Sequence, residues 1–232
     1  MRGVDYDSWA GYAASFMRPG SDVLECACGT GQISLRLAKM GFSVTASDIS
    51  DDMLMVAAEN QREAGLAFAK LRFIRMDMRE LSCHKKVDHV AACCDGVNYL
   101  TSRADVKRFF DSAYAVLKPG GTLLFDVSSR YKLEKILGSN SFVDNGEQVA
   151  YMWQNNYDED TKLIDMELSF FVKQGDRYER FDERHIQRAH SVRELGAWLN
   201  EAGFEYEAYY CFTREPVKAD DERIQFVARK SK

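Results

Sequence analysis

The sequence has little that would favour disorder, membrane insertion or export. Only three prolines occur among 232 residues, and with 14 Phe and 11 Tyr they argue against a disordered chain. No apolar run comes near the ~18 residues that a bilayer-spanning helix needs. Residues 1–7 also lack the apolar core of a signal peptide. We therefore expect a cytoplasmic protein.

The chain also lacks an excess of positive charge. Its 31 Lys and Arg face 36 Asp and Glu, which gives a formal net charge of −5. With a pI near 5.5, the protein has no overall electrostatic attraction to nucleic acid or to an anionic membrane. Six cysteines in a chain without a secretory signal are expected to be reduced thiols. The length and the 46% hydrophobic content suit one domain with a sizeable core.

Short apolar runs alternate with helical patterns through the first half of the chain. This alternation is typical of a doubly wound α/β fold, in which helices cover both faces of a mostly parallel sheet. Ser50 is expected to cap one of these helices, and the cluster 118–121 to end another. The strands are expected at 23–26, 42–46, 71–76, 87–93 and 122–127.

The pattern changes after about residue 140. Apolar and polar residues alternate over 149–153 and 164–172, and the charged run 178–190 resembles a half-exposed strand. We expect an antiparallel meander that is inserted into, or laid over, the parallel sheet. Ser191 and Glu194 form a capping box that opens a helix. Two closing strands are expected at 204–212 and 223–229.

The most informative stretch lies where the first strand passes into a helix, and it reads Val23-Leu-Glu-Cys-Ala-Cys-Gly-Thr-Gly31. Glycine at both 29 and 31 permits a sharp turn and lets a ligand approach the backbone closely. A dinucleotide-binding turn would have Gly or Ala three residues after Gly31, where this sequence has Ser34. The acidic Glu25 before the glycines suits a ligand that carries a positive amino group.

Two further acidic residues stand at the ends of the next two strands. Asp48 follows the second strand, where a carboxylate can accept hydrogen bonds from both hydroxyls of a ribose. Asp77 follows the third strand, where it could meet the exocyclic amine of adenine, with Ile49 and Met78 on either side of the ring. Each aspartate alone could equally be a cap or turn residue. Acids at successive strand ends together indicate a ligand site at the carboxyl edge of the sheet.

This set of residues resembles the class I S-adenosylmethionine-dependent methyltransferases. Glu25-x-Ala27-x-Gly29-x-Gly31 is similar to their glycine-rich first motif, and Leu117-Lys-Pro-Gly-Gly121 to the loop before their fifth strand. The resemblance covers roughly residues 20–130 and implies a seven-stranded sheet whose last strand is antiparallel. It implies S-adenosylmethionine as the cofactor and S-adenosylhomocysteine as its product. The cofactor-binding residues are then expected to be Tyr12, Glu25, Ala27, Gly29, Gly31, Asp48, Ile49, Met53, Asp77, Met78 and Cys93.

These methyltransferases place residues between the methyl donor and its acceptor just after the fourth strand. Here that segment offers Asp95 and Asn98 as acceptor-facing residues, with Tyr99 as a weaker candidate. The resemblance also suggests that the aromatic N-terminal segment folds over the cofactor as a lid, with Tyr6 and Tyr12 facing the site. The alternative for this segment is a helix packed into the core.

The charged run 178–190 offers further acceptor-facing candidates. Alternation along a strand would place Arg184, Arg188 and His190 on one side, where they could bind a polar or anionic acceptor. The alternative is a solvated outer face. His185 and His190 have no carboxylate or thiol at ligand spacing, so we predict no metal site.

The favoured function is transfer of a methyl group from S-adenosylmethionine to a nitrogen or oxygen of a small molecule. A tRNA or rRNA methyltransferase and a non-catalytic module that binds the cofactor are the alternatives. The acidic charge argues against nucleic acid as a partner, and no membrane partner is expected. Neither the acceptor nor the oligomeric state follows from the sequence. Within one domain, 1–232, we expect an N-terminal lid at 1–20, a cofactor-binding core at 21–130, an antiparallel insertion at 145–190, and a closing helix and strands at 191–232.

Overall fold

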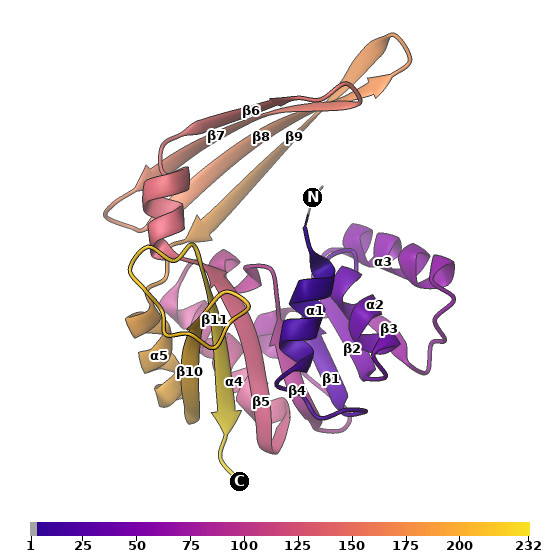
Figure 1. The fold of residues 1–232 in the computed structure, drawn as a ribbon, viewed down its shortest axis with the longest axis vertical. Coiled ribbons are helices and arrows are strands. Elements are labelled where there is room, and N and C mark those ends of the chain that lie inside the picture. The colour runs from indigo at the N-terminus through magenta and orange to yellow at the C-terminus, as the bar shows by residue number, and fades with distance from the viewer. Residues whose placement is uncertain (1–3) are drawn as a thin grey trace.

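A seven-stranded sheet forms the centre of the structure, a computed structural model that describes residues 4–232 (Figure 1). The predicted lid at 1–20 is therefore described only from residue 4. From one edge of this sheet to the other, the strands are β10 (Phe204–Tyr210), β11 (Arg223–Lys230), β5 (Leu117–Ser128), β4 (Val87–Ala92), β1 (Asp22–Cys26), β2 (Ser43–Asp48) and β3 (Leu71–Arg75).

The direction of the strands matches the predicted fold class. Strands β1 to β5 pair in parallel, whereas β11 runs antiparallel to both of its neighbours, β5 and β10. This arrangement confirms a doubly wound, mostly parallel sheet with an antiparallel last strand. It also brings the carboxyl ends of the five parallel strands to one edge of the sheet, where the predicted site residues lie.

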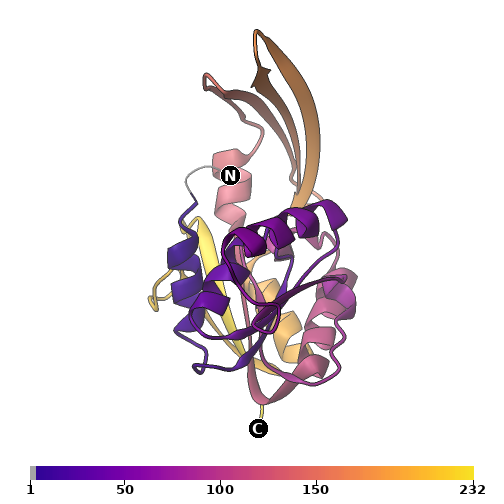
Figure 2. The same ribbon diagram turned by 90° about the vertical axis from the view of Figure 1, so that its right-hand side faces the viewer.

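Helices cover both faces of the seven-stranded sheet (Figure 2). Two of them pack against one face, together with Leu24, Val90 and Phe125 of the sheet. Three pack on the other face, where Val23, Ala91 and Leu124 point. The first pair is α4 (Arg103–Val116) and α5 (Val192–Glu201); the other three are α1 (Tyr6–Ala14), α2 (Gln32–Lys39) and α3 (Asp51–Glu63).

Local sequence signals place the ends of several helices. The Ser50 side chain accepts a hydrogen bond from the Met53 backbone N–H at 3.2 Å and caps α3, as predicted. The expected capping box of α5 is also present, with Ser191 and Glu194 bonded reciprocally. The cluster after α4 ends that helix but belongs to β5, which begins at Leu117 and not at 122.

The second half of the chain forms a separate four-stranded antiparallel sheet, which rises beyond the carboxyl edge of the first sheet (Figure 1). The sequence left open whether the meander is inserted into the parallel sheet or laid over it. In the structure it is a sheet of its own, outside the parallel sheet. Its first strand and the short π-helix before it were not expected from the sequence. The elements are the π-helix η3 (Lys132–Leu137) and the strands β6 (Ser141–Asn145), β7 (Val149–Asp158), β8 (Leu163–Gln174) and β9 (Arg177–Arg188).

The two faces of this second sheet differ in chemistry. Residues paired across strands share a face, so the register separates an apolar face from a charged one. On the charged face, Arg184 forms an ion pair with Asp165 at 2.5 Å. We call the opposite side the inner face, because its base packs on Leu133 and Leu137 of η3. The inner face carries Phe142, Tyr151, Trp153, Ile164, Met166, Leu168, Phe170, Phe181, Glu183, His185 and Gln187.

None of the helices within residues 4–232 has the length and apolar composition needed to cross a bilayer. The six cysteine thiols are free.

Candidate functional site

The glycine-rich turn after β1 borders open space at Gly29. A Cβ added to Gly29 would meet no atom within 4 Å, so its backbone borders free space. A Cβ on Gly31 would come within 2.7 Å of Phe73 Cζ, so this glycine is needed for packing between α2 and β3. Both glycines have positive φ, +52° and +74°, as does Ala27 at 51°. The two glycines therefore serve different purposes, one for access and one for packing.

Glu25 lies on β1, just before this turn, and is almost completely buried. The Ser34 hydroxyl at the start of α2 donates a hydrogen bond to its carboxylate. Burial raises the pKa of Glu25 to about 7, against the lowering effect of the Ser34 hydrogen bond; nearby Asp48 raises it further. A buried carboxylate with no cation beside it is a strong acceptor for a positively charged ligand group.

Asp48 is oriented by the backbone around it. One carboxylate oxygen accepts a hydrogen bond from Gly29 N–H at 2.8 Å, and the other accepts one from Ser50 N–H at 3.0 Å. Each oxygen keeps a lone pair for a further donor, such as a ribose hydroxyl. Beside Asp48, Ile49 and Met53 are 59% and 45% exposed, which leaves an apolar surface at the carboxyl edge. A flat aromatic base could cover this surface.

Asp77 lies two residues after the end of β3, and Arg79 occupies much of its hydrogen-bonding capacity. The two side chains form an ion pair at 2.6 Å, and the Asp77 carboxylate also accepts the Arg79 backbone N–H at 2.8 Å. The hydrogen bond from Arg79 holds the pKa of Asp77 below its usual value. Asp77 is therefore ionised and fixed in place, and Met78 beside it is half-buried. Contact of either residue with adenine stays a prediction.

The segment after β4 contains two consecutive non-glycine residues in the left-handed region, Cys94 (φ 61°) and Asp95 (φ 55°). Their backbone N–H groups donate to the two carboxylate oxygens of Asp126 at 2.7 and 2.9 Å. Asp126 is completely buried on β5 and forms an ion pair with Arg223 of β11. This buried pair stabilises a backbone conformation that would otherwise be strained.

Asp95 itself is bound from two directions. Its carboxylate accepts hydrogen bonds from Arg223 at 2.9 Å and from the Gln187 amide at 3.0 Å. The Arg223 guanidinium also lies over the Trp9 ring of α1, 5.0 Å from its centroid. The network thus joins the segment after β4 to the second sheet, to β11 and to the N-terminal helix.

Two of the predicted acceptor-facing residues are enclosed in the protein. Asn98 is fully buried, and its amide bonds Ser128 and the carbonyl of Arg188. His190 is fully buried too, with Nε2 at 3.0 Å from the Leu100 carbonyl and its ring against Trp198. Burial lowers the pKa of His190 to about 4, so it is neutral near pH 7. Neither side chain is open to an acceptor, and we do not retain them as candidates.

Arg184 and Arg188 share one face of β9, as alternation predicts, but this is the charged face away from η3. The strand ends at Arg188, so His190 does not continue the alternation and turns into the core instead.

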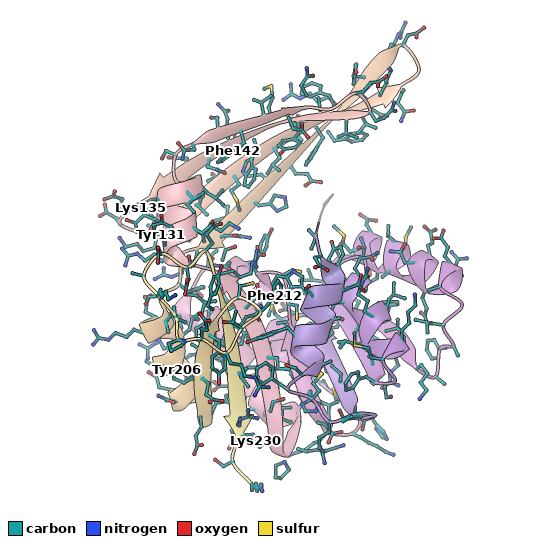
Figure 3. The ribbon with its side chains drawn as sticks, viewed as in Figure 1. Tyr131, Lys135, Phe142, Tyr206, Phe212 and Lys230 are labelled. Atoms are coloured by element: carbon teal, nitrogen blue, oxygen red, sulfur yellow. The ribbon has the colours of Figure 1, made fainter. Side chains whose placement is uncertain are left out.

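The N-terminal helix is packed rather than loosely laid over the edge. Trp9, Ala10 and Ala13 are buried, which favours the core-helix alternative for most of α1. The Tyr12 hydroxyl donates to the Thr213 carbonyl at 2.8 Å. Phe212, from the loop after β10, lies beside α1 in Figure 3, its ring edge-on to Trp9 with 4.9 Å between the centroids. Tyr6 stays half-exposed, with the Arg36 guanidinium 5.4 Å from its ring centroid.

Comparison with known proteins identifies the family. A family model described as "methyltransferase domain" matches residues 23–121. The methyltransferase-family protein YqeM of Bacillus subtilis (strain 168) is 38% identical over 234 residues, which span 100% of this chain and 93% of that protein. The chain belongs to the class I S-adenosylmethionine-dependent methyltransferases.

Solved structures agree with this assignment. An S-adenosylmethionine-dependent methyltransferase from Clostridium acetobutylicum ATCC 824 is 31% identical with a TM-score of 0.91, covering 99% of this chain and 94% of that one. CalS10 from Micromonospora echinaspora, an amino pentose methyltransferase solved with S-adenosylmethionine, has a TM-score of 0.76 at 20% identity, over 99% of this chain and 93% of its own. The latter likeness shows the shared fold.

The residues of this methyltransferase fit its cofactor, S-adenosylmethionine. Open space borders Gly29, the buried Glu25 has no cation beside it among the described residues, and Ile49 presents an apolar surface next to Asp48. Cys93 directly follows β4 and is buried. Burial raises the pKa of its thiol, so the thiol is neutral. When bound, the cofactor supplies an electrophilic methyl group on a sulfonium.

Sequence reasoning missed Asp126, Arg223 and Gln187. One signal was available: Asp126 is a lone acid inside the apolar strand Leu123-Leu-Phe-Asp-Val127, and such a residue needs a buried partner. Nothing in the local sequence pointed to Arg223 or Gln187, because their partners lie 97 and 92 residues away.

Proposed function

We propose that this methyltransferase acts on a nitrogen or oxygen of a small-molecule acceptor, which binds between the carboxyl edge of the seven-stranded sheet and the inner face of the second sheet. The observation that carries the proposal is the pair of hydrogen bonds from β9 to the segment after β4. Gln187 bonds Asp95, and the Arg188 carbonyl accepts from Asn98 at 2.9 Å. These bonds hold the inner face next to the segment that follows β4.

The inner face suits a small organic molecule. Tyr151 and Phe170 lie 6.1 Å apart by ring centroids and are half-exposed, and Phe181 beside them is 46% exposed. Exposed aromatic rings on a sheet with no layer packed over them are typical of a binding surface. A neighbour of the same fold, KedS8 from Streptoalloteichus sp. ATCC 53650, is described as a sugar N-methyltransferase, which also supports an amine as the acceptor.

The chain's own residues mainly bind and orient the reactants in this proposal. Aligning the donor and the acceptor can contribute ~7–11 kcal/mol to the reduction of the barrier. Glu25 and Asp48 would hold the two ends of the donor, and Arg223 with Asp126 would fix the segment after β4. The Asp95 carboxylate would border the acceptor.

Two measurements test the proposal. Isothermal titration calorimetry with S-adenosylhomocysteine should show binding, and labelled S-adenosylmethionine should transfer its methyl group to a member of a panel of small amines, amino sugars and phenols. The same assay with total tRNA and rRNA should give no labelled product. Labelled RNA, with unlabelled small molecules, would replace this proposal with the nucleic-acid alternative.

A further inference from the structure

Three titratable side chains form a hydrogen-bonded chain between the segment after β4 and the inner face of the second sheet. The short 3₁₀ helix η2 (Gly96–Tyr99) begins directly after Asp95, and Tyr99 is its last residue. Its hydroxyl lies 3.2 Å from Nδ1 of His185 on β9. On the other side of the ring, His185 Nε2 lies 3.1 Å from a carboxylate oxygen of Glu183.

The register of β9 places these three hydrogen-bonded side chains on the surface that faces the proposed acceptor. Glu183, His185 and Gln187 alternate along the strand and so lie on the same face, and Gln187 bonds Asp95. Across the strand pair, His185 and Glu183 stand opposite Met166 and Leu168 of the apolar inner face. Tyr99, His185 and Glu183 therefore lie between the aromatic part of the inner face and the segment after β4.

The direction of the hydrogen bonds follows from the chemistry of the members. Burial raises the pKa of the Tyr99 phenol, and the Asp95 and Glu183 carboxylates raise it further. The Glu183 carboxylate can only accept a hydrogen bond, so in a neutral ring Nε2 carries the proton and donates to it, which is how a carboxylate orients a histidine base. Nδ1 is then the unprotonated nitrogen, and it accepts from the Tyr99 hydroxyl.

We propose that Tyr99, His185 and Glu183 form a relay that takes up the proton released by the acceptor during methyl transfer. The inference rests on the proposed function and applies to an acceptor that carries an N–H or O–H, because such a group loses this proton as the neutral methylated product forms. Histidine is the side chain best suited to take up a proton near neutral pH.

The reaction balances with these groups alone. The acceptor's lone pair forms a bond to the methyl carbon while the carbon–sulfur bond breaks, and the bonding electrons stay on sulfur, which becomes a neutral thioether. The acceptor proton passes to the Tyr99 oxygen as the Tyr99 proton passes to His185 Nδ1. The resulting imidazolium is stabilised by the Glu183 carboxylate. The His185 side chain is 34% exposed, so it can return the proton to solvent.

Within residues 4–232, few other charged groups face His185. Glu183 is its neighbour on β9, and Tyr99 faces it from η2. Asp95 lies beyond Gln187 and is held by Arg223, so its charge is largely compensated. A pH dependence that disappears when His185 is replaced can therefore be attributed to this ring.

The first test reads the position of the proton directly and needs no acceptor. In protein labelled with ¹⁵N-histidine and saturated with S-adenosylhomocysteine, the spectrum of His185 is assigned by its loss in the His185→Gln variant. The relay requires a ring protonated on Nε2, and Glu183→Gln should mix the two tautomers. Predominant protonation on Nδ1 in the wild type would overturn the proposal, because that nitrogen could not accept from Tyr99.

The second test measures the rate of methylation with labelled S-adenosylmethionine, using a protein-free extract of small Bacillus subtilis metabolites as the acceptor source. His185→Gln should slow transfer by about 10²–10⁴-fold and remove the acidic limb of the pH profile, and Tyr99→Phe should slow it also. Affinity for S-adenosylhomocysteine should be unchanged in both. Glu167→Gln, on the opposite face of the neighbouring strand β8, is the matched control for Glu183→Gln and should leave the rate unchanged.

The outcomes separate the relay from the proposed function. If His185→Gln keeps the wild-type rate and pH profile, the relay is wrong while small-molecule methylation stands. If the wild type labels nothing in the extract but labels RNA, the proposed function is wrong, and the tautomer measurement still decides whether the relay exists.

Discussion

The cofactor end and the acceptor end of the site are built from the chain in different ways. The proposed cofactor end takes Glu25, Gly29 and Asp48 from a single β1–α2–β2 unit, and its hydrogen bonds join residues close in sequence. The acceptor end joins Asp95 to Arg223 across 128 residues and to the second sheet through Gln187. The proposed cofactor contacts can thus be encoded locally, whereas the shape of the proposed acceptor space depends on tertiary packing.

The largest effect is expected at the glycine that borders free space. Gly29→Val should abolish measurable S-adenosylhomocysteine binding in calorimetry, because its side chain would fill the space next to the backbone. The left-handed backbone at this position should cost about 1–2 kcal/mol of stability, so the variant should remain folded. Gly31→Ala is the contrasting variant: its Cβ would collide with Phe73, and we expect loss of stability in urea unfolding. Normal binding by folded Gly29→Val would mean that this glycine serves only the turn.

At the acceptor end, Arg223→Met should destabilise the fold more than it weakens cofactor binding. Removal of one partner of a buried ion pair typically costs about 3–5 kcal/mol, and here Asp126 would be left buried without its cation. Urea unfolding measures the loss. Arg184→Gln removes an exposed ion pair on the charged face of the second sheet and should change stability by less than ~1 kcal/mol. Equal effects of the two variants would contradict the assignment of Arg223 to a buried network.

The sequence anticipated the structure wherever the cause was local. The capping box at Ser191 and the cap at Ser50 depend on residues three positions apart, and both formed as predicted. Strand β6 was missed because Ser141–Asn145 is short and lacks clear alternation, and its pairing with β7 is what makes it a strand. His190 was assigned to the wrong environment because alternation cannot show where a strand ends. Contacts across many residues, such as Asp126 with Arg223, leave no local pattern.

A smaller effect is expected for the carboxylate assigned to the ribose. Asp48→Ala should weaken S-adenosylhomocysteine binding by about 1.5–3 kcal/mol, the usual range for hydrogen bonds to a charged group. The backbone N–H groups of Gly29 and Ser50 lose their acceptor as well, so thermal stability should be measured beside affinity. Asp51→Ala, on the first turn of α3 and exposed, is the control and should bind normally. Unchanged affinity in a folded Asp48→Ala protein would mean that the ribose lies elsewhere.

The smallest effect is a dependence on pH that belongs to the cofactor end alone. Burial raises the pKa of Glu25 from 4.5 to about 7, so this carboxyl stabilises the free protein fully below pH 4.5, and its contribution is lost as the pH rises through 7. A cofactor ammonium would favour the ionised form, so affinity should fall by about tenfold for each pH unit below 7 and level off above it. Glu25→Gln should remove this slope, weaken binding at pH 8 and make the free protein more stable there, because a neutral amide avoids the cost of a buried charge. Calorimetry from pH 6 to 8, in buffers of different ionisation enthalpy, measures the proton released on binding. Affinity that does not change over this range would place the ammonium away from Glu25 and leave only the hydrogen bond from Ser34 to explain why an acid is buried on β1.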